Sequence, residues 1–402
     1  MLGGLYKKTT YLNEYRKTHK NLIVVDSGDL LNEHEDIKAS FMPSARLKAE
    51  LIAKVYKGID IDAIDVGELD LALGVDFLKD LEKKYGTPFI SANIVDKNNQ
   101  LVFKPYVIEN LGDLKVGIIG IMGTTSDVSK KFKAIVGSSL SVLDPMKTVA
   151  DKVAEIKDKV DYVVVLTHQH IGRNWVIARK IDGVDLVVGG HHTQRLKTPY
   201  HANNTYIVQS GEKGQYQGMF EVEIAADGTK TVKNTLVPMS DKIANNPEVK
   251  AMIDKFNNEV TQLYTTGSSE KVDKVTPKSI QCKDCHEDAY AVWEKSKHAK
   301  AFQTLIDKGR QFNPDCLVCH TTRFEEKGGF TVTAQQKDLR NVQCESCHGD
   351  SAAHMEDPDV HFKTKPGVET CVKCHTEHRC PDFRKNYAQE WEKIKHKGES
   401  DK

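Results

Sequence analysis

Short apolar runs alternate with amphipathic stretches over the first 240 residues of this chain. Several of the runs are apolar on both faces, as expected for strands buried inside a sheet. The predicted strands begin at Leu22, Ala63, Pro88, Lys115, Tyr162, Leu186, Tyr206 and Phe220, and the predicted helices cover 44–57, 75–85, 145–159 and 173–180. The pattern predicts a layered α/β fold for this part of the chain.

The pattern changes in the last third of the chain. Residues 247–265 are amphipathic and predict a closing helix, which a segment rich in Thr, Gly, Ser and Lys follows. Beyond residue 278, strand periodicity is absent and helical stretches alternate with loops. We therefore expect an α/β domain and a mostly α domain joined by a helix and linker. The predicted boundaries are 1–245, 246–278 and 279–402.

Charge and hydropathy narrow the range of partners. The chain has 57 basic and 57 acidic side chains, so its net charge favours neither nucleic acid nor an anionic membrane surface. Its longest strongly apolar run, VGIIGIM from Val116, is too short to span a bilayer.

Four copies of Cys-x-x-Cys-His occur after residue 281. Two thiols at this spacing form thioethers to the vinyl groups of one haem, and the adjacent histidine binds its iron. Zinc ribbons and disulfide frameworks also use paired cysteines, but neither needs a histidine after the second one. We therefore expect four covalently attached c-type haems. Their attachment residues are Cys282, Cys285, His286, Cys316, Cys319, His320, Cys344, Cys347, His348, Cys371, Cys374 and His375.

About 120 residues with four haems cannot build an ordinary core, so the porphyrins must supply most of the buried apolar surface. Five further histidines could bind iron on the distal side, and the alternative for each is an exposed ring or one that contacts a haem propionate. These are His298, His354, His361, His378 and His396. Met355 allows at most one Met/His site, and Cys380 is outside every motif. Cys380 is interpreted as a free thiol, with an intermolecular bridge or an unusual ligand as alternatives.

The segments CKDCHEDAYAVWEKSKHAKA, VQCESCHGDSAAH and CVKCHTEH resemble the tetrahaem cytochrome family that includes the electron acceptor of hydroxylamine oxidoreductase. The resemblance covers about 279–402. It implies haems stacked in near-parallel and near-perpendicular pairs, with room for one iron without a distal protein ligand. It also implies a redox protein as donor and another as acceptor.

A second resemblance covers the first 240 residues. VVDSGDLL, DAIDVGELDLALGVDFL, VVVLTHQHIG and GVDLVVGGHHTQ follow the motif order of metallophosphoesterases of the periplasmic 5'-nucleotidase type, whose fold sulfur-oxidising hydrolases share. The family uses two divalent metals to activate water against phosphorus. The resemblance assigns Asp29, Glu68, His168 and His191 as metal ligands, a set that suits one Zn, Mn or Fe ion.

The metal motifs depart from the family pattern in several places. Gly67-Glu68-Leu69-Asp70 stands where the family has Gly-Asn-His-Glu, and Glu68 could replace the amide as an oxygen ligand. Leu69 replaces the catalytic histidine, and Thr193 replaces the second histidine of Gly-His-x-His, although neighbouring His192 could compensate. The Asp-x-His motif would lie before residue 1. Retained phosphoesterase activity, one structural metal and no metal therefore all stay open, and no catalytic residue is assigned.

We expect an extracytoplasmic electron-transfer protein whose phosphoesterase-like domain is a scaffold or docking module. The alternative is a phosphoesterase or sulfur-compound hydrolase coupled to electron transfer by its haems, and self-association could extend the electron path. Haem attachment of this kind takes place outside the cytoplasm, yet the N-terminal MLGGLYKKTTYLNEYRK lacks the apolar stretch of a signal peptide. We therefore expect an export signal upstream of residue 1 and a periplasmic location.

Overall fold

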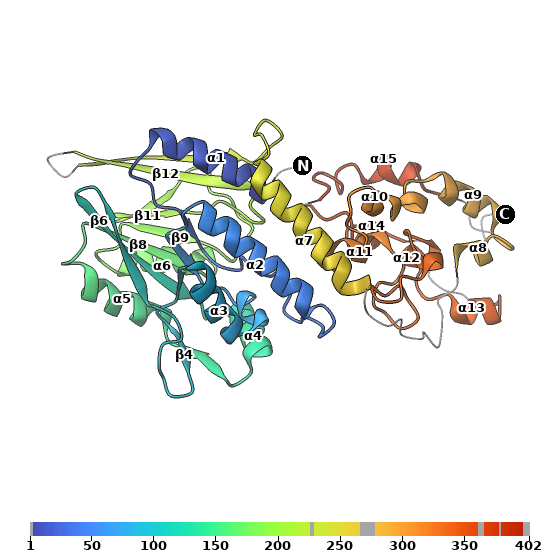
Figure 1. The fold of residues 1–402 in the computed structure, drawn as a ribbon, viewed down its shortest axis with the longest axis horizontal. Helices are drawn as coiled ribbons and strands as arrows, with labels where there is room; N and C mark the ends of the chain where they lie inside the picture. Colours follow the sequence, from blue (N-terminus) through green and yellow to red (C-terminus); the bar gives the residue numbers. More distant parts are fainter. Residues whose placement is uncertain (1–2, 226–228, 266–277, 361–365, 378, 397–402) are drawn as a thin grey trace. The chain divides into compact units, whose positions relative to one another are not determined.

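The computed structural model describes residues 3–225, 229–265, 278–360, 366–377 and 379–396 (Figure 1). The chain divides into two compact units, Met1–Ile253 and Asp254–Lys402. The division falls inside helix α7 (Pro247–Thr265), where the sequence predicts the closing helix. Each unit is described by itself below.

A six-stranded sheet with the strand order β10-β11-β9-β8-β6-β5 forms the centre of the first unit. Its inner strands run parallel, and the two edge strands pair antiparallel. The strands are β5 (Tyr106–Leu111), β6 (Leu114–Met122), β8 (Tyr162–His168), β9 (Leu186–Gly189), β10 (Tyr200–Ala202) and β11 (Thr205–Val208). Every residue of β8 is buried, as its continuous apolar run predicts.

A smaller parallel sheet contains β1 (Val25–Asp26), β2 (Ala63–Asp65) and β3 (Phe89–Ile90). Two antiparallel pairs complete the strands: β4 (Ile94–Asp96) with β7 (Leu140–Val142), and β12 (Tyr216–Ile224) with β13 (Lys230–Pro238). The single strand predicted from Pro88 is wrong, because the chain divides there into β3 and β4. Between them the buried amide of Asn93 bonds to both backbone groups of Met122, at 2.7 and 3.0 Å.

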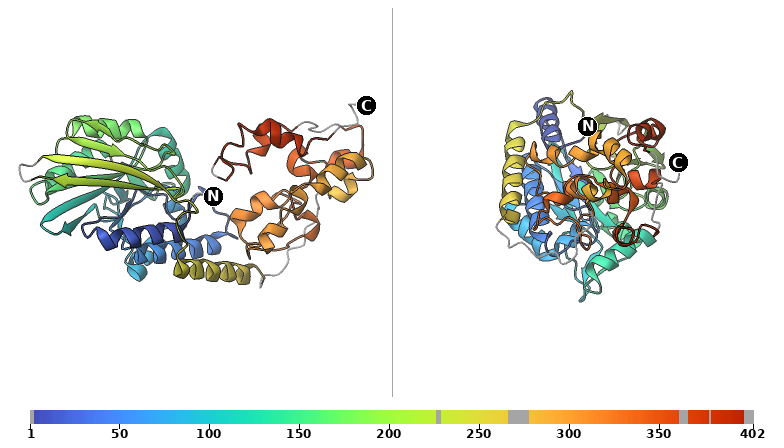
Figure 2. Two further views of the ribbon diagram at one scale, coloured as in Figure 1. Left: turned by 90° about the horizontal axis from the view of Figure 1, so that it is seen from above. Right: turned by 90° about the vertical axis from the view of Figure 1, so that its right-hand side faces the viewer.

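Helices cover the outer faces of the two sheets (Figures 1 and 2). They are α1 (Leu5–Thr18), α2 (Met42–Gly58), the short η1 (Asp70–Leu73), α3 (Val75–Tyr85), α4 (Ser126–Val136), α5 (Pro145–Ile156) and α6 (Ile171–Lys180). One apolar cluster contains residues of the small sheet and of the four helices α1, α2, α3 and α4. A second contains residues of the large sheet and of α5 and α6. A third, which includes Ala63, Ile118 and Leu166, contains residues of both sheets. The first unit is thus a layered α/β sandwich.

The described residues of the second unit form short helices and loops, without a β-strand. The helices are α8 (Ser279–Cys282), α9 (Glu287–Lys295), η2 (His298–Lys300), α10 (Gln303–Ile306), α11 (Pro314–His320), η3 (Lys337–Leu339), α12 (Cys344–His348), α13 (Ala352–Glu356), α14 (Val368–Cys371) and α15 (Tyr387–Glu392). Residues 288–309, a helical stretch by sequence pattern, do not form one continuous helix. The stretch breaks into three pieces, the first of which ends at Lys295 before the extended backbone of Ser296.

The helices were compared with the length and hydropathy that a membrane-spanning helix needs. Within the residues that the structure describes, no helix combines the length and the apolar character needed to cross a bilayer.

Candidate functional site

Four polar side chains from separate segments meet in the first unit. Asp29, Glu68, His168 and His191 each offer a ligand atom, and these atoms lie within 4.8 Å of one another. His168 ends β8, while the other three follow β1, β2 and β9. The carboxyl ends of parallel strands therefore build the cluster, although its members are far apart in the chain. We call these four residues the cluster.

The ring of His168 is held with one nitrogen toward the cluster. Its Nδ1–H donates to the backbone carbonyl oxygen of Ser27 at 2.7 Å, so that Nε2 points toward the carboxylates of Asp29 and Glu68. Nε2 lies 3.1 Å from Oδ2 of Asp29 and 3.1 Å from Oε2 of Glu68. Burial opposes a charged ring, but the two carboxylates outweigh it and raise the pKa of His168 well above its usual value. The cluster therefore attracts positive charge.

The ring of His191 is oriented in the same way, by a side chain. Its Nε2 contacts Oδ2 of Asp127 at 2.8 Å, and its Nδ1 lies 3.2 Å from Oε1 of Glu68 and 3.2 Å from Nε2 of His168. His191 has a φ of +64°, in the left-handed region, and Gly190 precedes it where a Cβ would lie 2.5 Å from the carbonyl oxygen of Ser27.

Asp127 is a site residue that the sequence analysis missed. It lies in the first turn of α4, shortly after the carboxyl end of β6. That position is the sequence signal for it, because the same edge of the sheet carries His168 at the end of the neighbouring strand. The hydrogen bond from His191 contributes most to lowering the pKa of the Asp127 carboxyl.

The carboxylate of Glu68 shows what the cluster is suited to hold. It is fully buried, and its oxygens lie 3.1 Å from Nε2 of His168 and 3.2 Å from Nδ1 of His191 without well-aligned hydrogen bonds in the described part of the chain. Burial disfavours its charge, yet His168 and His191 lower its pKa below the usual range. A buried carboxylate is costly unless positive charge compensates it, which either charged imidazoles or a bound cation can supply. Two carboxylate oxygens beside two imidazole nitrogens fit one divalent Zn, Mn or Fe ion.

Asp70 fixes the two loops that carry the carboxylates. Its buried side chain accepts backbone N–H bonds from Asp29 at 2.8 Å, Leu31 at 2.8 Å and Gly67 at 3.1 Å. Burial, followed by the nearby charge of Asp29, raises the pKa of Asp70 to about 7. Gly67 permits the close approach, since a Cβ there would lie 2.2 Å from Oδ1 of Asp29.

The residues at the departures from the family pattern do not complete a second metal site. Leu69 contributes its backbone N–H, which donates to Oδ1 of Asp29 at 2.8 Å. Thr193 is exposed. His192 does not compensate for it: its ring meets the ring of His170 edge-on, with centroids 4.5 Å apart. Of the described residues, only the four cluster members form such a set of ligand atoms.

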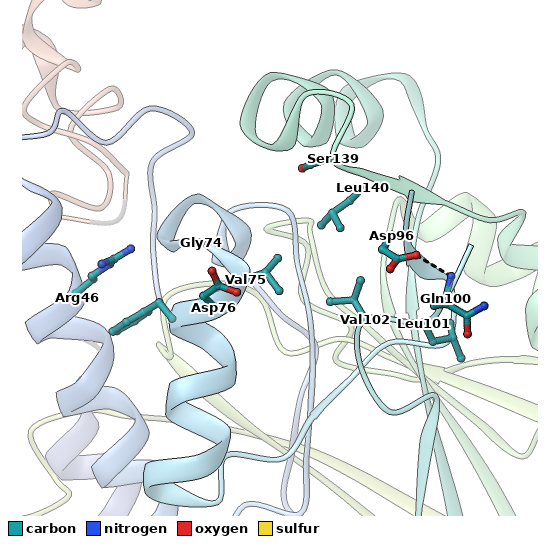
Figure 3. A pocket seen from close by; sticks show the side chains of 11 residues that line it. Arg46, Gly74, Val75, Asp76, Asp96, Gln100, Leu101, Val102, Ser139 and Leu140 are labelled. Atoms are coloured by element: carbon teal, nitrogen blue, oxygen red, sulfur yellow. Dashed lines mark hydrogen bonds between the residues drawn. The ribbon is translucent and has the colours of Figure 1, made fainter. Parts of the chain in front are cut away.

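A pocket of about 530 Å³ lies elsewhere in the first unit (Figure 3). The side chain of Arg46 at its edge is engaged by the protein, because it donates to the carbonyl oxygen of Leu73 at 3.0 Å and lies over the ring of Phe77. None of the cluster residues lines this pocket. The pocket therefore adds no chemistry to the candidate site.

In the second unit, each Cys-x-x-Cys-His motif lies on or beside a short helix: α8, α11, α12 or α14. All nine cysteines are free of disulfide bonds. Three motif histidines each face one of the additional histidines. The ring centroids are 6.1 Å apart for His286 and His354, 6.0 Å for His375 and His298, and 5.8 Å for His348 and His396.

This spacing is compatible with two imidazoles that would hold one iron between them. Two iron–nitrogen bonds of about 2 Å place the centres of the two imidazole rings roughly 6 Å apart. The Nδ1–H of His354 donates to the carbonyl oxygen of Val360 at 3.0 Å, and that of His396 to Ile394 at 3.2 Å. In both rings the nitrogen that bonds to the backbone is Nδ1, and Nε2 is the nitrogen that would bind a metal.

The fourth motif histidine has a different environment. The Nδ1–H of His320 donates to the carbonyl oxygen of Ala301 at 2.7 Å, and in the described part of the chain no second histidine ring faces it. The predicted ligands His361 and His378 lie outside the described residues. Met355 is exposed.

Cys380 lies beside His375, the histidine of the last Cys-x-x-Cys-His motif. Its Sγ is 3.4 Å from Nδ1 of His375, and the ring of Phe383 stacks on the same histidine with centroids 4.4 Å apart. Burial raises the pKa of the Cys380 thiol, which favours the neutral form. Cys380 forms no disulfide within the chain, and its thiol contacts an imidazole.

Known proteins resemble the two parts of the chain separately. Residues 281–349 match the family described as cytochrome c554 and c-prime. The trifunctional nucleotide phosphoesterase protein YfkN of Bacillus subtilis (strain 168) is 26% identical over 302 residues, which cover 64% of this chain and 20% of that protein. The 5'-nucleotidase of Bos taurus is 26% identical over 290 residues, which cover 63% of this chain and 47% of that protein. The chain thus spans less than half the length of either relative.

The fold comparison agrees with these sequence matches. The Thermus thermophilus sulfate thiohydrolase SoxB in complex with glycerol superimposes with a TM-score of 0.56 at 17% identity, covering 66% of this chain and 48% of that chain. The N-terminal part has a metallophosphoesterase-like α/β fold and is homologous to 5'-nucleotidase-type phosphoesterases. The chain is a fusion of this part with a cytochrome c554 region, and both predicted resemblances are confirmed.

Proposed function

We propose that this protein is an extracytoplasmic electron carrier with four covalently attached haems, and that its phosphoesterase-like unit is a scaffold or docking module. The observation that carries the proposal is the spacing of three histidine pairs, each between 5.8 and 6.1 Å, in a region with four Cys-x-x-Cys-His motifs. When bound, the haems supply reversible one-electron chemistry. The partners are a redox protein as donor and another as acceptor.

Each described histidine pair combines a proximal ligand from a motif with a distal ligand from elsewhere. His354, His298 and His396 are the distal ligands opposite His286, His375 and His348. Two imidazoles close an iron to substrates and favour electron transfer over substrate chemistry. His361 and His378 are the candidates for the distal side of His320.

The haem count and the ligand sets are tested on the purified holoprotein. A pyridine haemochrome assay is expected to give four haems per chain, and electron paramagnetic resonance is expected to show three low-spin irons with two imidazole ligands each. A count far below four would overturn the proposal. Four haems with fewer than three such low-spin signals would retain the electron carrier and overturn the ligand pairs.

In the first unit we propose that the cluster holds one divalent ion. Asp29, Glu68, His168 and His191 would bind it, and a bound divalent ion acts as a Lewis acid and lowers the pKa of bound water. Leu69 at the position of the family's catalytic histidine argues for a scaffold role, since it cannot move a proton.

The cluster is also the observation that favours a second candidate function, a phosphoesterase or sulfur-compound hydrolase coupled to the haems. Metal analysis of the purified protein separates the two. Absence of a stoichiometric divalent ion would exclude the hydrolase, whereas an ion accompanied by turnover of a phosphate ester would favour it. Light scattering at high protein concentration tests self-association. A sample that contains only monomers would contradict it.

A further inference from the structure

We propose that Lys131 forms an oxyanion-binding site together with a single divalent ion in the cluster, in place of a second metal. The ligand class is a tetrahedral oxyanion, such as inorganic phosphate or the phosphate or sulfate group of an ester. The inference rests on the metal occupancy proposed above and names a further binding residue beside it.

Helix α4 presents two side chains to the cluster. Asp127 in its first turn holds His191, and Lys131 four residues later has its Nζ 3.8 Å from Oε1 of Glu68. Residues four apart lie on the same face of a helix. One face of α4 therefore supplies both a carboxylate and an ammonium group to the same site.

The ammonium group of Lys131 lies at the border between the cluster and solvent. The Lys131 side chain is 34% exposed, whereas the Glu68 side chain is fully buried. Glu68 is the ion-pair partner found for Lys131 in the described part of the chain, and its oxygens accept no hydrogen bond there. At 3.8 Å the two groups attract each other while the N–H donors of Lys131 stay free for a ligand.

The charges at this site balance without a second metal. Asp29, Glu68 and Asp127 carry three negative charges when ionised, which one divalent ion and the ammonium of Lys131 neutralise. Phosphoesterases with two metals use both ions to bind the oxygens of phosphate. Here Lys131 can bind such an oxygen by a charge-assisted hydrogen bond, while an ion that accepts five or six ligands, such as Mn²⁺, binds another.

The test uses the full-length holoprotein, with Mn²⁺ alone and then inorganic phosphate as probes in isothermal titration calorimetry. Lys131→Met removes the charge, Lys131→Arg keeps it, and Lys133→Met on the exposed side of the same helix is the matched control. Wild type is expected to bind one Mn²⁺ per chain and to bind phosphate only after Mn²⁺ is present.

Lys131→Met should move the two affinities in opposite directions. Mn²⁺ should bind about three- to tenfold more tightly, because a cation that competes for Glu68 has gone. Phosphate should bind to the Mn²⁺ form about tenfold or more weakly, because a charge-assisted hydrogen bond is lost. Lys131→Arg should restore most of the phosphate affinity, and Lys133→Met should match wild type. A folding defect would instead weaken both affinities.

The possible failures are distinguishable. No Mn²⁺ binding by wild type overturns the proposed metal occupancy and with it this inference, but leaves the haem-based function intact. One bound Mn²⁺ with a phosphate affinity that Lys131→Met does not change overturns the role of Lys131 alone. The role of Lys131 is also overturned if two Mn²⁺ ions bind per chain, or if the Mn²⁺ form binds no phosphate.

Discussion

The carboxylate of Asp127 lies 2.8 Å from Nε2 of His191, the ring nitrogen that faces away from the cluster. The contact fixes which nitrogen of His191 points toward Glu68, and it joins helix α4 to a loop that follows another strand. A carboxylate in this position orients an imidazole ligand and makes it a stronger donor to a metal.

Replacement of Asp127 by Ala should weaken divalent-metal binding without removing any residue of the cluster. Loss of a partner that orients a metal-binding histidine typically lowers metal affinity about 10- to 100-fold. Competition with a chromophoric chelator measures the change. Asp80→Ala, at an exposed position on α3, is the control and should bind metal as wild type does. Equal affinity in all three proteins would contradict the role of Asp127.

Asp62 gives the first unit a specific pH dependence. Its Oδ2 accepts the backbone N–H of Val24 at 2.6 Å, and burial is the main cause that raises its pKa to about 6. The folded state therefore binds this proton more tightly than the unfolded chain, whose carboxyl has a pKa of about 4. The contribution of Asp62 to the free energy of unfolding should fall as the pH rises from about 4 to 6 and stay low above that.

Asp62→Asn keeps the hydrogen-bond acceptor and removes the ionisation. After allowance for solvent screening of a partly exposed group, we expect the variant to gain about 1 kcal/mol relative to wild type between pH 4.5 and pH 7. Urea unfolding followed by circular dichroism at both pH values checks this. The same pH dependence in variant and wild type would refute the assignment, and Asp80→Asn should leave the dependence unchanged.

His354→Ala should convert one haem from low spin to high spin. The ring of His354 faces His286 at 6.1 Å, so its removal leaves that iron with one protein ligand. Electron paramagnetic resonance should show one new high-spin signal while the haem count stays at four. His19→Ala, at an exposed position of the first unit, should leave the spectrum unchanged. An unchanged spectrum in His354→Ala would exclude His354 as the distal ligand.

Cys380→Ala should raise the reduction potential of the haem attached at Cys371 and Cys374. With iron on Nε2 of His375, the Nδ1–H of that ring donates to Sγ of Cys380 at 3.4 Å, and loss of the acceptor makes the imidazole a weaker donor. A hydrogen bond of about 0.5–1 kcal/mol corresponds to roughly 20–40 mV for one electron. Spectroelectrochemical titration measures the shift. Cys380→Ser, which keeps an acceptor, should shift the potential less, and identical titrations of Cys380→Ala and wild type would rule out the contact as a tuning element.

Gly190→Ala should destabilise the first unit because its new Cβ would lie 2.5 Å from the carbonyl oxygen of Ser27, which accepts the hydrogen bond from His168. Overpacking against backbone of this kind costs about 1–3 kcal/mol. Thermal unfolding measures the loss. Gly58→Ala, at the end of α2, has no atom within 4 Å of its new Cβ and should be neutral or slightly stabilising. A Gly190→Ala variant as stable as wild type would contradict the steric argument.

The sequence predicted the features of the fold that rest on local patterns. The buried run from Tyr162 appears as β8, and the amphipathic pattern of 75–85 appears as α3 with the same bounds. The pattern failed where tertiary contacts interrupt the backbone. In the gap between β3 and β4, the side-chain amide of Asn93 bonds to the backbone of Met122 in place of strand pairing. The helical stretch after Asp288 breaks beside the Cys-x-x-Cys-His motifs. Helix α4 and its Asp127 were not predicted, although the segment is amphipathic and buries Val128 and Phe132 four residues apart.

The sequence by itself determined which side chains this protein offers as ligands, because the Cys-x-x-Cys-His motifs have a fixed spacing and the metal motifs a fixed order. It could not determine which groups meet. Only the tertiary structure brought Asp127 to His191, Lys131 to Glu68, and Cys380 to His375. Two of these contacts join residues more than 60 positions apart. They form where parallel strands of two sheets end together, and no spacing along the chain encodes that meeting.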